Sequence, residues 1–283
     1  MIYSITRRKA LLIPAIFSVL LVSGCQQNNA GSPSSEPPLE KAQSISEVSQ
    51  ISRPIDAYLP TASEVLSLAR LQIRTTNSCY AKNGLPQEYA KNVSDSKLLD
   101  FIKFGIRNRS VRSDLWGFFD PAQPAKDGYR YPSDFKGLEL TKGNVPDEVF
   151  KSCDDEAKKS VSSNLGFLGY LGQEILPNGG PLIPLQDTRF ASIAGQWSSC
   201  MTSEGLSYAT PISAVSDLKW RSGTVPSKEE IAVAAADKKC KSNVNLVGSA
   251  LAVQAAYDKA YIAQYKAQLD GFKTQLANLV KAS

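Results

Sequence analysis

Cysteine usage constrains this chain more than any other feature of its sequence. Five cysteines occur in 283 residues, and the first of them, Cys25, closes an apolar leader. A basic cluster at residues 7–9 precedes an uncharged apolar stretch at residues 10–22, and Ser23 and Gly24 then lead into Cys25. The apolar stretch is shorter than the ~20 residues that a membrane-spanning helix needs. A leader of this order is typical of an exported chain.

Small residues directly before a cysteine suit cleavage at Cys25 and acylation of its thiol. We therefore expect residues 1–24 to be a lipoprotein signal peptide, and Cys25 to carry the lipid (a diacylglycerol, with palmitate as a typical acyl chain) in the mature chain. The alternative is an ordinary signal peptide with an incidental cysteine. Arg7 and Arg8 also fit a twin-arginine export signal loosely, so the export route stays open.

The basic balance of the chain comes mostly from this leader. Removing residues 1–24 removes three of the 32 Lys and Arg residues and none of the 27 Asp and Glu residues, which leaves 29 against 27. Binding a phosphate backbone needs a concentrated basic face, and no long run of Lys or Arg follows Cys25. We therefore expect no nucleic-acid partner.

Residues 25–52 are rich in Gln, Asn, Ser, Gly and Pro. Such a composition buries too little apolar surface to offset chain entropy, so it predicts a disordered tether. The remaining residues, 53–283, form the expected helical domain. A Gly- and Pro-rich segment from residue 166 to 184 divides it into sub-halves at about 53–165 and 185–283.

Lipidation of Cys25 leaves four cysteines, an even number that suits disulfides in an oxidising compartment. Four cysteines allow three pairings. The repeated pattern Ser-Cys-x-x-x-x-Gly-Leu surrounds Cys79 and Cys200, and each copy precedes a helical segment that carries the next cysteine. This repeat favours the pairs Cys79–Cys153 and Cys200–Cys240. A metal or redox site is the alternative, but there is no Cys-x-x-Cys and no histidine, so we expect no metal and no cofactor.

Helical periodicity and capping residues recur through residues 53–283. Thr61 with Glu64 resembles a capping box, and a second helix is expected over residues 94–107. Further helices are expected from Pro146 to about residue 163, from Asp187 to residue 204, and from Ser227 onward, the last running to the C-terminus with a break or kink at Gly248. The prediction is an all-α fold of two disulfide-linked helical halves with long ordered loops and a long C-terminal helix.

Two interpretations of the C-terminal helix stay open. Its apolar stripe, which includes Tyr257, Tyr261, Tyr265 and Leu269, packs on the body if the helix is short enough. If the helix extends beyond the body, the stripe offers a surface for a partner helix.

The loop-rich segment from residue 108 to 145 contains the candidate ligand-binding residues. Planar rings interleave there with Arg, Asp and Gly, and the candidates are Trp116, Tyr129, Arg130 and Tyr131. Such rings stack sugars or peptides in binding sites. The alternative is that they pack a loop-rich core, which is the usual role of large rings.

Catalytic patterns are scarce. Without histidine, Ser-His and Cys-His mechanisms are excluded. Carboxylates are the remaining acid–base groups, and the aromatic segment holds Asp114, Asp120, Asp127 and Asp134. They carry the alternative hypothesis, a carboxylate-dependent hydrolase of cell-wall material. No pattern assigns a catalytic residue, and the sequence favours a chain that is not an enzyme.

Several motifs resemble an uncharacterised family of actinobacterial lipoproteins. They are Arg53-Pro54-Ile55-Asp56-Ala57-Tyr58, Leu115-Trp116-Gly117-Phe118-Phe119, Trp197-Ser198-Ser199-Cys200-Met201 and Ala236-Asp237-Lys238-Lys239-Cys240. The resemblance covers residues 53 to about 260 and departs from the family at Cys79-Tyr80, where the family often has Cys-Met. It implies a lipoprotein, two disulfides and a helical body in a Gram-positive cell, and it implies no activity.

Together these observations predict an extracytoplasmic protein anchored to the cell membrane through Cys25. We expect a non-enzymatic binding or interaction protein of the cell envelope. Its expected partners are the lipid bilayer, through the acylated cysteine, and an envelope protein or glycan.

Overall fold

The computed structural model describes residues 36–111, 128–129 and 137–283. These residues form α-helices and short 3-10 helices with connecting loops, and no strand occurs among them. The all-α prediction is therefore confirmed. Cys25 and most of the aromatic segment lie outside the described residues, and so do the predictions made for them.

The first group of helices contains α1 (Ala62–Lys82), α2 (Asp95–Val111), α4 (Asp147–Ser160) and the 3-10 helix η4 (Gly166–Leu171). The N–H of Glu64 donates to the Thr61 hydroxyl at 3.3 Å, and the Glu64 carboxylate accepts the Thr61 N–H at 2.7 Å, which confirms the capping box. Helix α1 packs on both α2 and α4. The core between these elements includes Val65, Leu68, Leu98, Ile102, Phe167 and Tyr170.

The second group contains α5 (Thr188–Ser203), α6 (Pro211–Val215), the 3-10 helix η6 (Leu218–Arg221) and α7 (Lys228–Asn243). Asp187 caps α5 and Ser227 caps α7, each by accepting backbone N–H groups of the first turn. Large apolar side chains, among them the fully buried Trp197 and Met201, form its core together with the start of α8.

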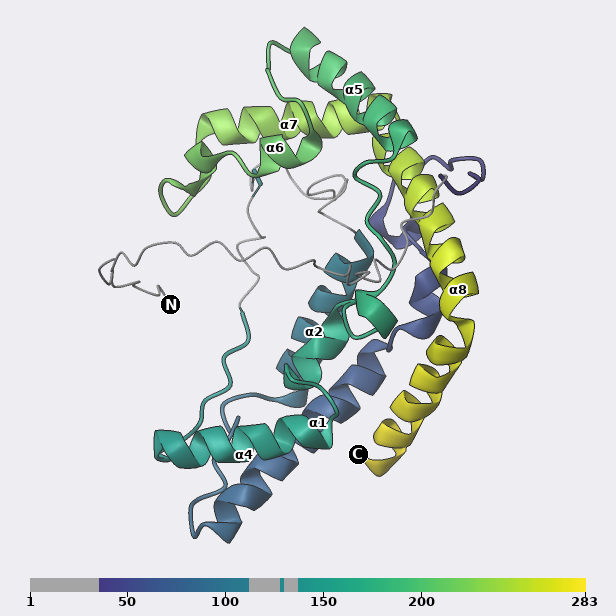
Figure 1. Cartoon of the computed structure of the whole chain (residues 1–283). Coiled ribbons are helices and arrows are strands. Elements are labelled where there is room, and N and C mark those ends of the chain that lie inside the picture. Colours follow the sequence, from purple (N-terminus) through teal and green to yellow (C-terminus); the bar gives the residue numbers. More distant parts are fainter. Residues whose placement is uncertain (1–35, 112–127, 130–136) are drawn as a thin grey trace, which may run out of the picture. The chain divides into compact units, whose positions relative to one another are not determined.

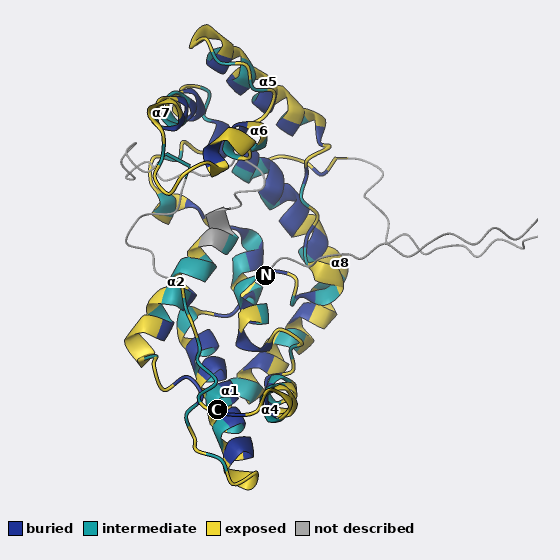
Figure 2. Ribbon diagram, turned by 90° about the vertical axis from the view of Figure 1, so that its left-hand side faces the viewer, coloured by how far each residue is buried: buried dark blue, intermediate teal, exposed yellow. Residues whose placement is uncertain are grey.

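Helix α8 (Leu246–Ala282) packs on both groups. It contacts α5 and α7 near its start, and further along it contacts α1 and the 3-10 helices η2 (Pro54–Tyr58) and η5 (Pro177–Gly179) (Figure 1). The two sub-halves expected from the sequence thus share α8. Buried residues are dense from Leu246 to Tyr261 and thin out to Leu269 and Leu276 (Figure 2).

The break before α8 lies at Asn245, not at Gly248 as the sequence predicted. Asn245 adopts the left-handed backbone conformation (φ 47°) and separates α7 from α8. Gly248 lies inside α8, where it is buried, and a Cβ at this position would collide with the carbonyl oxygen of Gln43. This glycine therefore permits a close approach of backbone to helix, and it does not break the helix.

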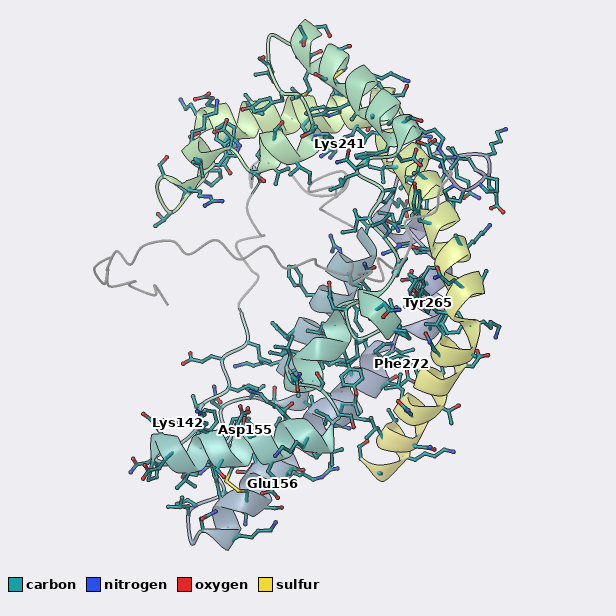
Figure 3. The ribbon with its side chains drawn as sticks, in the orientation of Figure 1. Lys142, Asp155, Glu156, Lys241, Tyr265 and Phe272 are labelled. Carbon is teal, nitrogen blue, oxygen red and sulfur yellow. A yellow bond between two sulfur atoms is a disulfide. The ribbon has the colours of Figure 1, made fainter. Side chains whose placement is uncertain are left out.

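The apolar stripe of the C-terminal helix packs on the body. Tyr261 and Leu269 are buried against Ile55, Leu59 and Leu176, and Tyr265 and Phe272 pack against the same cluster (Figure 3). The Tyr261 hydroxyl donates to the Pro177 carbonyl at 2.5 Å. Within the described residues the first interpretation of the stripe therefore holds, since its aromatic side chains already contact η2 and η5.

Both disulfides form in the pairing that the repeated cysteine pattern favoured. Cys79 of α1 bonds to Cys153 of α4, and Cys200 of α5 bonds to Cys240 of α7, with Cα–Cα distances of 5.5 and 5.6 Å. Each disulfide links two helices of the same group. Reduction would therefore loosen the groups individually rather than separate one from the other.

Residues 36–52 differ from the predicted tether, and we call them the strap. They run along α8 in an extended conformation with one 3-10 turn, η1 (Val48–Gln50). Composition predicted disorder because polar residues dominate the segment, but three apolar side chains at its end pack on the body. Ile51 is buried, and Ile45 and Val48 pack on the same core cluster.

Candidate functional site

The strap is held to the body by polar contacts along most of its length. The Glu36 carboxylate accepts the Thr188 N–H at 2.6 Å at the N-terminus of α5, a favourable position for an anion. The Pro37 carbonyl accepts from the Arg189 guanidinium at 2.7 Å. Further along, Glu40 pairs with Lys259 of α8.

Directly after the strap, Arg53 forms a bidentate ion pair with Asp258 of α8. The two N–O distances are 2.6 and 2.9 Å, and neither side chain is exposed to solvent. Gln173 accepts from the same guanidinium at 3.2 Å, and Gln254 donates to Asp258 at 2.9 Å. This network joins the end of the strap to α8 at its middle.

Asp56 lies beside this network. Its Oδ2 accepts the Arg53 N–H at 2.9 Å, while its Oδ1 is buried without a hydrogen-bond partner. Burial raises the pKa of the Asp56 carboxyl, and the charges of Arg53 and Arg109 partly oppose that rise. A buried carboxylate with an unsatisfied oxygen is costly to the folded state.

A second buried ion pair stabilises the other helix group. Lys241 donates to Asp237 at 2.6 Å within α7, and the indole N–H of Trp197 donates to the same carboxylate at 2.9 Å (Figure 3). The side chains of Lys241 and Asp237 are 0% and 3% exposed. The pair lies in the core and is closed to a ligand.

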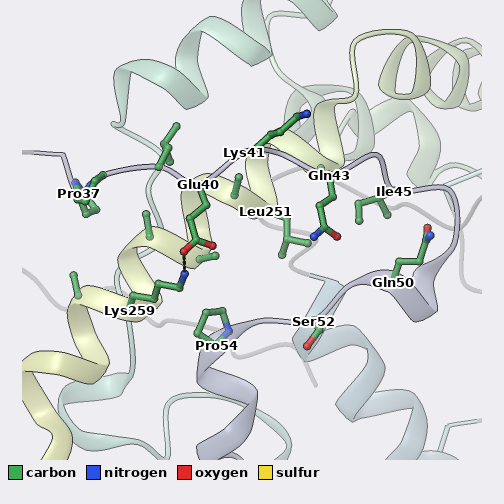
Figure 4. Close-up of a pocket in the computed structure, with 17 residues that line it drawn as sticks. Pro37, Glu40, Lys41, Gln43, Ile45, Gln50, Ser52, Pro54, Leu251 and Lys259 are labelled. Atoms are coloured by element: carbon green, nitrogen blue, oxygen red, sulfur yellow. Dashed lines mark hydrogen bonds and ion pairs between the residues drawn. The ribbon is translucent and has the colours of Figure 1, made fainter.

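Between the strap and α8 lies a pocket of about 680 Å³ (Figure 4). The strap passes over α8 from Pro37 to Ile45, turns through η1 and returns at Ser52 and Pro54, so that its two arms border the pocket. Apart from Lys259, the α8 side of the pocket consists of small and aliphatic residues, namely Gly248, Leu251, Ala252, Ala255, Ala256 and Ala260.

The polar side chains of this pocket are Glu40, Lys41, Gln43, Gln50, Ser52 and Lys259. Glu40 and Gln43 point toward α8, while Lys41 points away from it (Figure 4). The Gln43 carbonyl also accepts from Asn245 at 3.1 Å. A mostly apolar lining with a few placed polar groups is the usual composition of small-molecule sites, and the volume lies in their common range of ~300–1,000 Å³.

Of the predicted ligand-binding residues, the structure describes Tyr129 alone. Its ring packs at 6.1 Å from Trp220, and its backbone N–H donates to Glu230 at 3.2 Å. Burial raises the pKa of its hydroxyl strongly, with Asp237 adding to the rise. Tyr129 therefore packs against the core of the second helix group. The rest of the aromatic candidate, Trp116, Arg130 and Tyr131, lies outside the described residues, as do Asp114, Asp120, Asp127 and Asp134.

The acidic cluster on α4 belongs to the helix surface. Asp154 pairs with Lys158 at 2.6 Å, Glu156 pairs with Lys82 at 3.3 Å, and Asp155 is exposed (Figure 3). No group of three metal-binding side chains occurs in the part of the chain that the structure describes. None of its described helices combines the length and apolarity needed to cross a membrane.

Sequence reasoning missed the pocket and both buried ion pairs. Arg53 and Asp258 are 205 residues apart, so no local pattern connects them. The strap carries a weak signal for packing on the body, which is the three-residue spacing of Ile45, Val48 and Ile51. The polar residues of the segment outnumber these three.

Comparison of the chain with protein-family models, with curated proteins and with solved structures yields no match.

Proposed function

We propose that this chain is a lipid-anchored, extracytoplasmic binding protein of the cell envelope that is not an enzyme. The observation that carries the binding role is the pocket between the strap and α8. The leader that ends at Cys25 supports the anchor. The two disulfides support an oxidising compartment outside the cytoplasm.

The chemistry of the pocket favours binding over catalysis. Glycoside hydrolysis uses two carboxylates on either side of the scissile bond. The described pocket lining offers one carboxylate, Glu40, and that group is paired with Lys259. The family resemblance of residues 53–260 agrees with this proposal and adds no activity to it.

The anchor is tested by expressing the full chain in a bacterium that processes lipoproteins. We expect the mature protein in the membrane fraction, with an acylated Cys25 as its first residue by mass spectrometry. The Cys25→Ser variant should lose the lipid, and Ser32→Ala, a matched change in the same segment, should keep it. A mature N-terminus at another residue, without a lipid, would refute the anchor.

The binding role is tested with envelope material separated into lipid, glycan and protein fractions. A ligand that binds the folded chain raises its unfolding temperature by mass action. We expect one fraction to raise it, and the pocket variant Ala255→Trp to reduce that rise. If no fraction stabilises the chain, the binding role is wrong.

A further inference from the structure

Most of the residues that line the described pocket are apolar, and they include nearly all of its α8 side. Its α8 side presents the methyl groups of Ala252 and Ala255 and the side chain of Leu251. Its strap side adds Pro37, Pro38, Leu39 and Ile45. Removing apolar surface from water is the main driving force for filling such a space.

The pocket is also elongated. Its α8 residues run from Gly248 to Ala260, which corresponds to about 18 Å along a helix at 1.5 Å per residue. Most side chains along that length are small. A long space with an apolar wall along α8 fits an extended hydrocarbon chain better than a compact ring system.

One end of the pocket carries charge. Lys259 and Glu40 pair beside Ala260, and their side chains are 50% and 78% exposed. A polar headgroup placed there would remain in contact with water. The charges would then lie at the mouth while the hydrocarbon lies along the alanines.

The pocket is close in sequence to the expected anchor. Glu36, the first described residue of the strap, lies 11 residues after Cys25. A chain of that length spans at most about 40 Å when fully extended. If Cys25 is acylated, the pocket therefore remains within reach of the bilayer surface.

A partner helix fits this surface less well. Small residues on a helix often mark the close approach of another helix, but here the strap crosses that face. Glu40 pairs with Lys259 of α8, and the Gln43 carbonyl accepts from Asn245, the residue just before α8, so the two contacts are 14 residues apart. A helix could not lie along the alanines without displacing the strap.

We infer that this pocket binds a single long acyl chain, with its polar end at the Lys259–Glu40 pair. This inference rests on the proposed function, which supplies the source of the ligand. That source is a lipid of the membrane in which Cys25 is anchored.

The experiment uses the full chain in phosphatidylcholine vesicles that contain a diazirine-bearing fatty acid. After photolysis, the labelled peptides are mapped by mass spectrometry. We expect labels in residues 248–260 and in the strap, and a loss of labelling on the order of tenfold in Ala255→Trp, which fills the pocket. The control is Ala267→Trp, the same change at an exposed position of α8 outside the pocket.

A second pocket variant keeps the test decisive if Ala255→Trp does not fold. Leu39→Asp places a charge in the strap wall at a side chain that is already 41% exposed, and it should also lose labelling. Near-ultraviolet circular dichroism checks that both variants keep their tertiary structure. Equal labelling of the wild-type chain and both folded pocket variants, or labels confined to other peptides, would overturn the inference.

Failure of the anchor is distinguishable from failure of the pocket. The same fatty acid is added to the full chain without vesicles. Labelling of residues 248–260 in that sample, together with an unlipidated N-terminus, would refute the anchor and keep the acyl-chain site. A lipidated N-terminus without labelling of the pocket would refute the site and keep the anchor.

Discussion

Arg53 and Asp258 form a bidentate ion pair from which solvent is fully excluded, and they join the end of the strap to the middle of α8. Removing one member of a buried pair leaves the other charge uncompensated, which costs about 3–5 kcal/mol. Among the ion pairs that join residues 36–58 to the rest of the described fold, this one alone has both side chains fully buried.

The first prediction follows from this pair. Asp258→Ala should lower the free energy of unfolding by about 3–5 kcal/mol, because the Arg53 guanidinium stays buried without its partner. The matched control is Asp270→Ala, which removes the partner of Lys266 in a pair whose side chains are 61% and 53% exposed. Exposed pairs contribute about 0–1 kcal/mol. Urea unfolding measures both, and similar losses would contradict the prediction.

The second prediction compares two glycines of α8. Gly248→Ala should loosen the strap and cost about 1–3 kcal/mol, because the added methyl group meets the Gln43 carbonyl. Gly271→Ala should stabilise the chain by up to ~1 kcal/mol, since that position is exposed and nothing lies near its missing Cβ. Limited proteolysis of residues 36–52 and urea unfolding report the two effects. If the protease leaves residues 36–52 of Gly248→Ala intact, the prediction that this variant loosens the strap is wrong.

The third prediction concerns the disulfides. Replacing Cys79 and Cys153 with alanine should cost about 4 kcal/mol, and so should replacing Cys200 and Cys240, because each bond closes a long loop in the unfolded chain. In either double variant a reductant should lower the free energy of unfolding further, because it breaks the remaining disulfide. Peptide mapping without reduction checks the pairing, and a peptide that joins Cys79 to Cys200 would show it to be wrong.

The fourth prediction is a pH dependence at Asp56. Burial raises its pKa above the ordinary value of 3.8, so the folded chain keeps a proton there over a range in which the unfolded chain has lost it. The free energy of unfolding therefore falls as the pH rises from 3.8 through the folded-state pKa. Burial widens that range most, the Arg53 N–H and the charges of Arg53 and Arg109 narrow it, and the charge of Asp258 widens it.

Asp56→Asn removes this titration and retains a side-chain oxygen for the Arg53 N–H. Relative to the wild-type chain, the variant should therefore gain stability as the pH rises through that range. Urea unfolding of both chains from about pH 3 to about pH 7 measures the difference. A difference that stays constant across the range would disprove the assignment.

Local signals predicted much of this fold. The sequence predicts Thr61, Asp187 and Ser227 as helix starts because a capping side chain bonds a backbone N–H only two or three positions further on. The disulfide pairs followed from the repeated context of Cys79 and Cys200. The break before α8 was misplaced, because a glycine inside a helix can mark either a kink or a close contact, and the contact with Gln43 is not local.

The candidate site could not be predicted in the same way. The pocket requires that residues near position 40 lie on residues near position 255, and no periodicity reports that proximity. Composition predicts a tether for the strap because it averages over the many Gln, Ser and Pro residues and hides the few apolar ones. Its packing depends on Ile51 and on two acids, Glu36 and Glu40, that find basic partners on distant helices.

The route of the strap decides where a mechanical load would enter the molecule. If Cys25 is fixed in a membrane and the body is held by a partner, tension reaches the strap first at Glu36. It passes through exposed pairs such as Glu40–Lys259 and arrives at Arg53 and Asp258, the first fully buried link. The strap would peel away before any disulfide carried force, and its pocket would open as it did so.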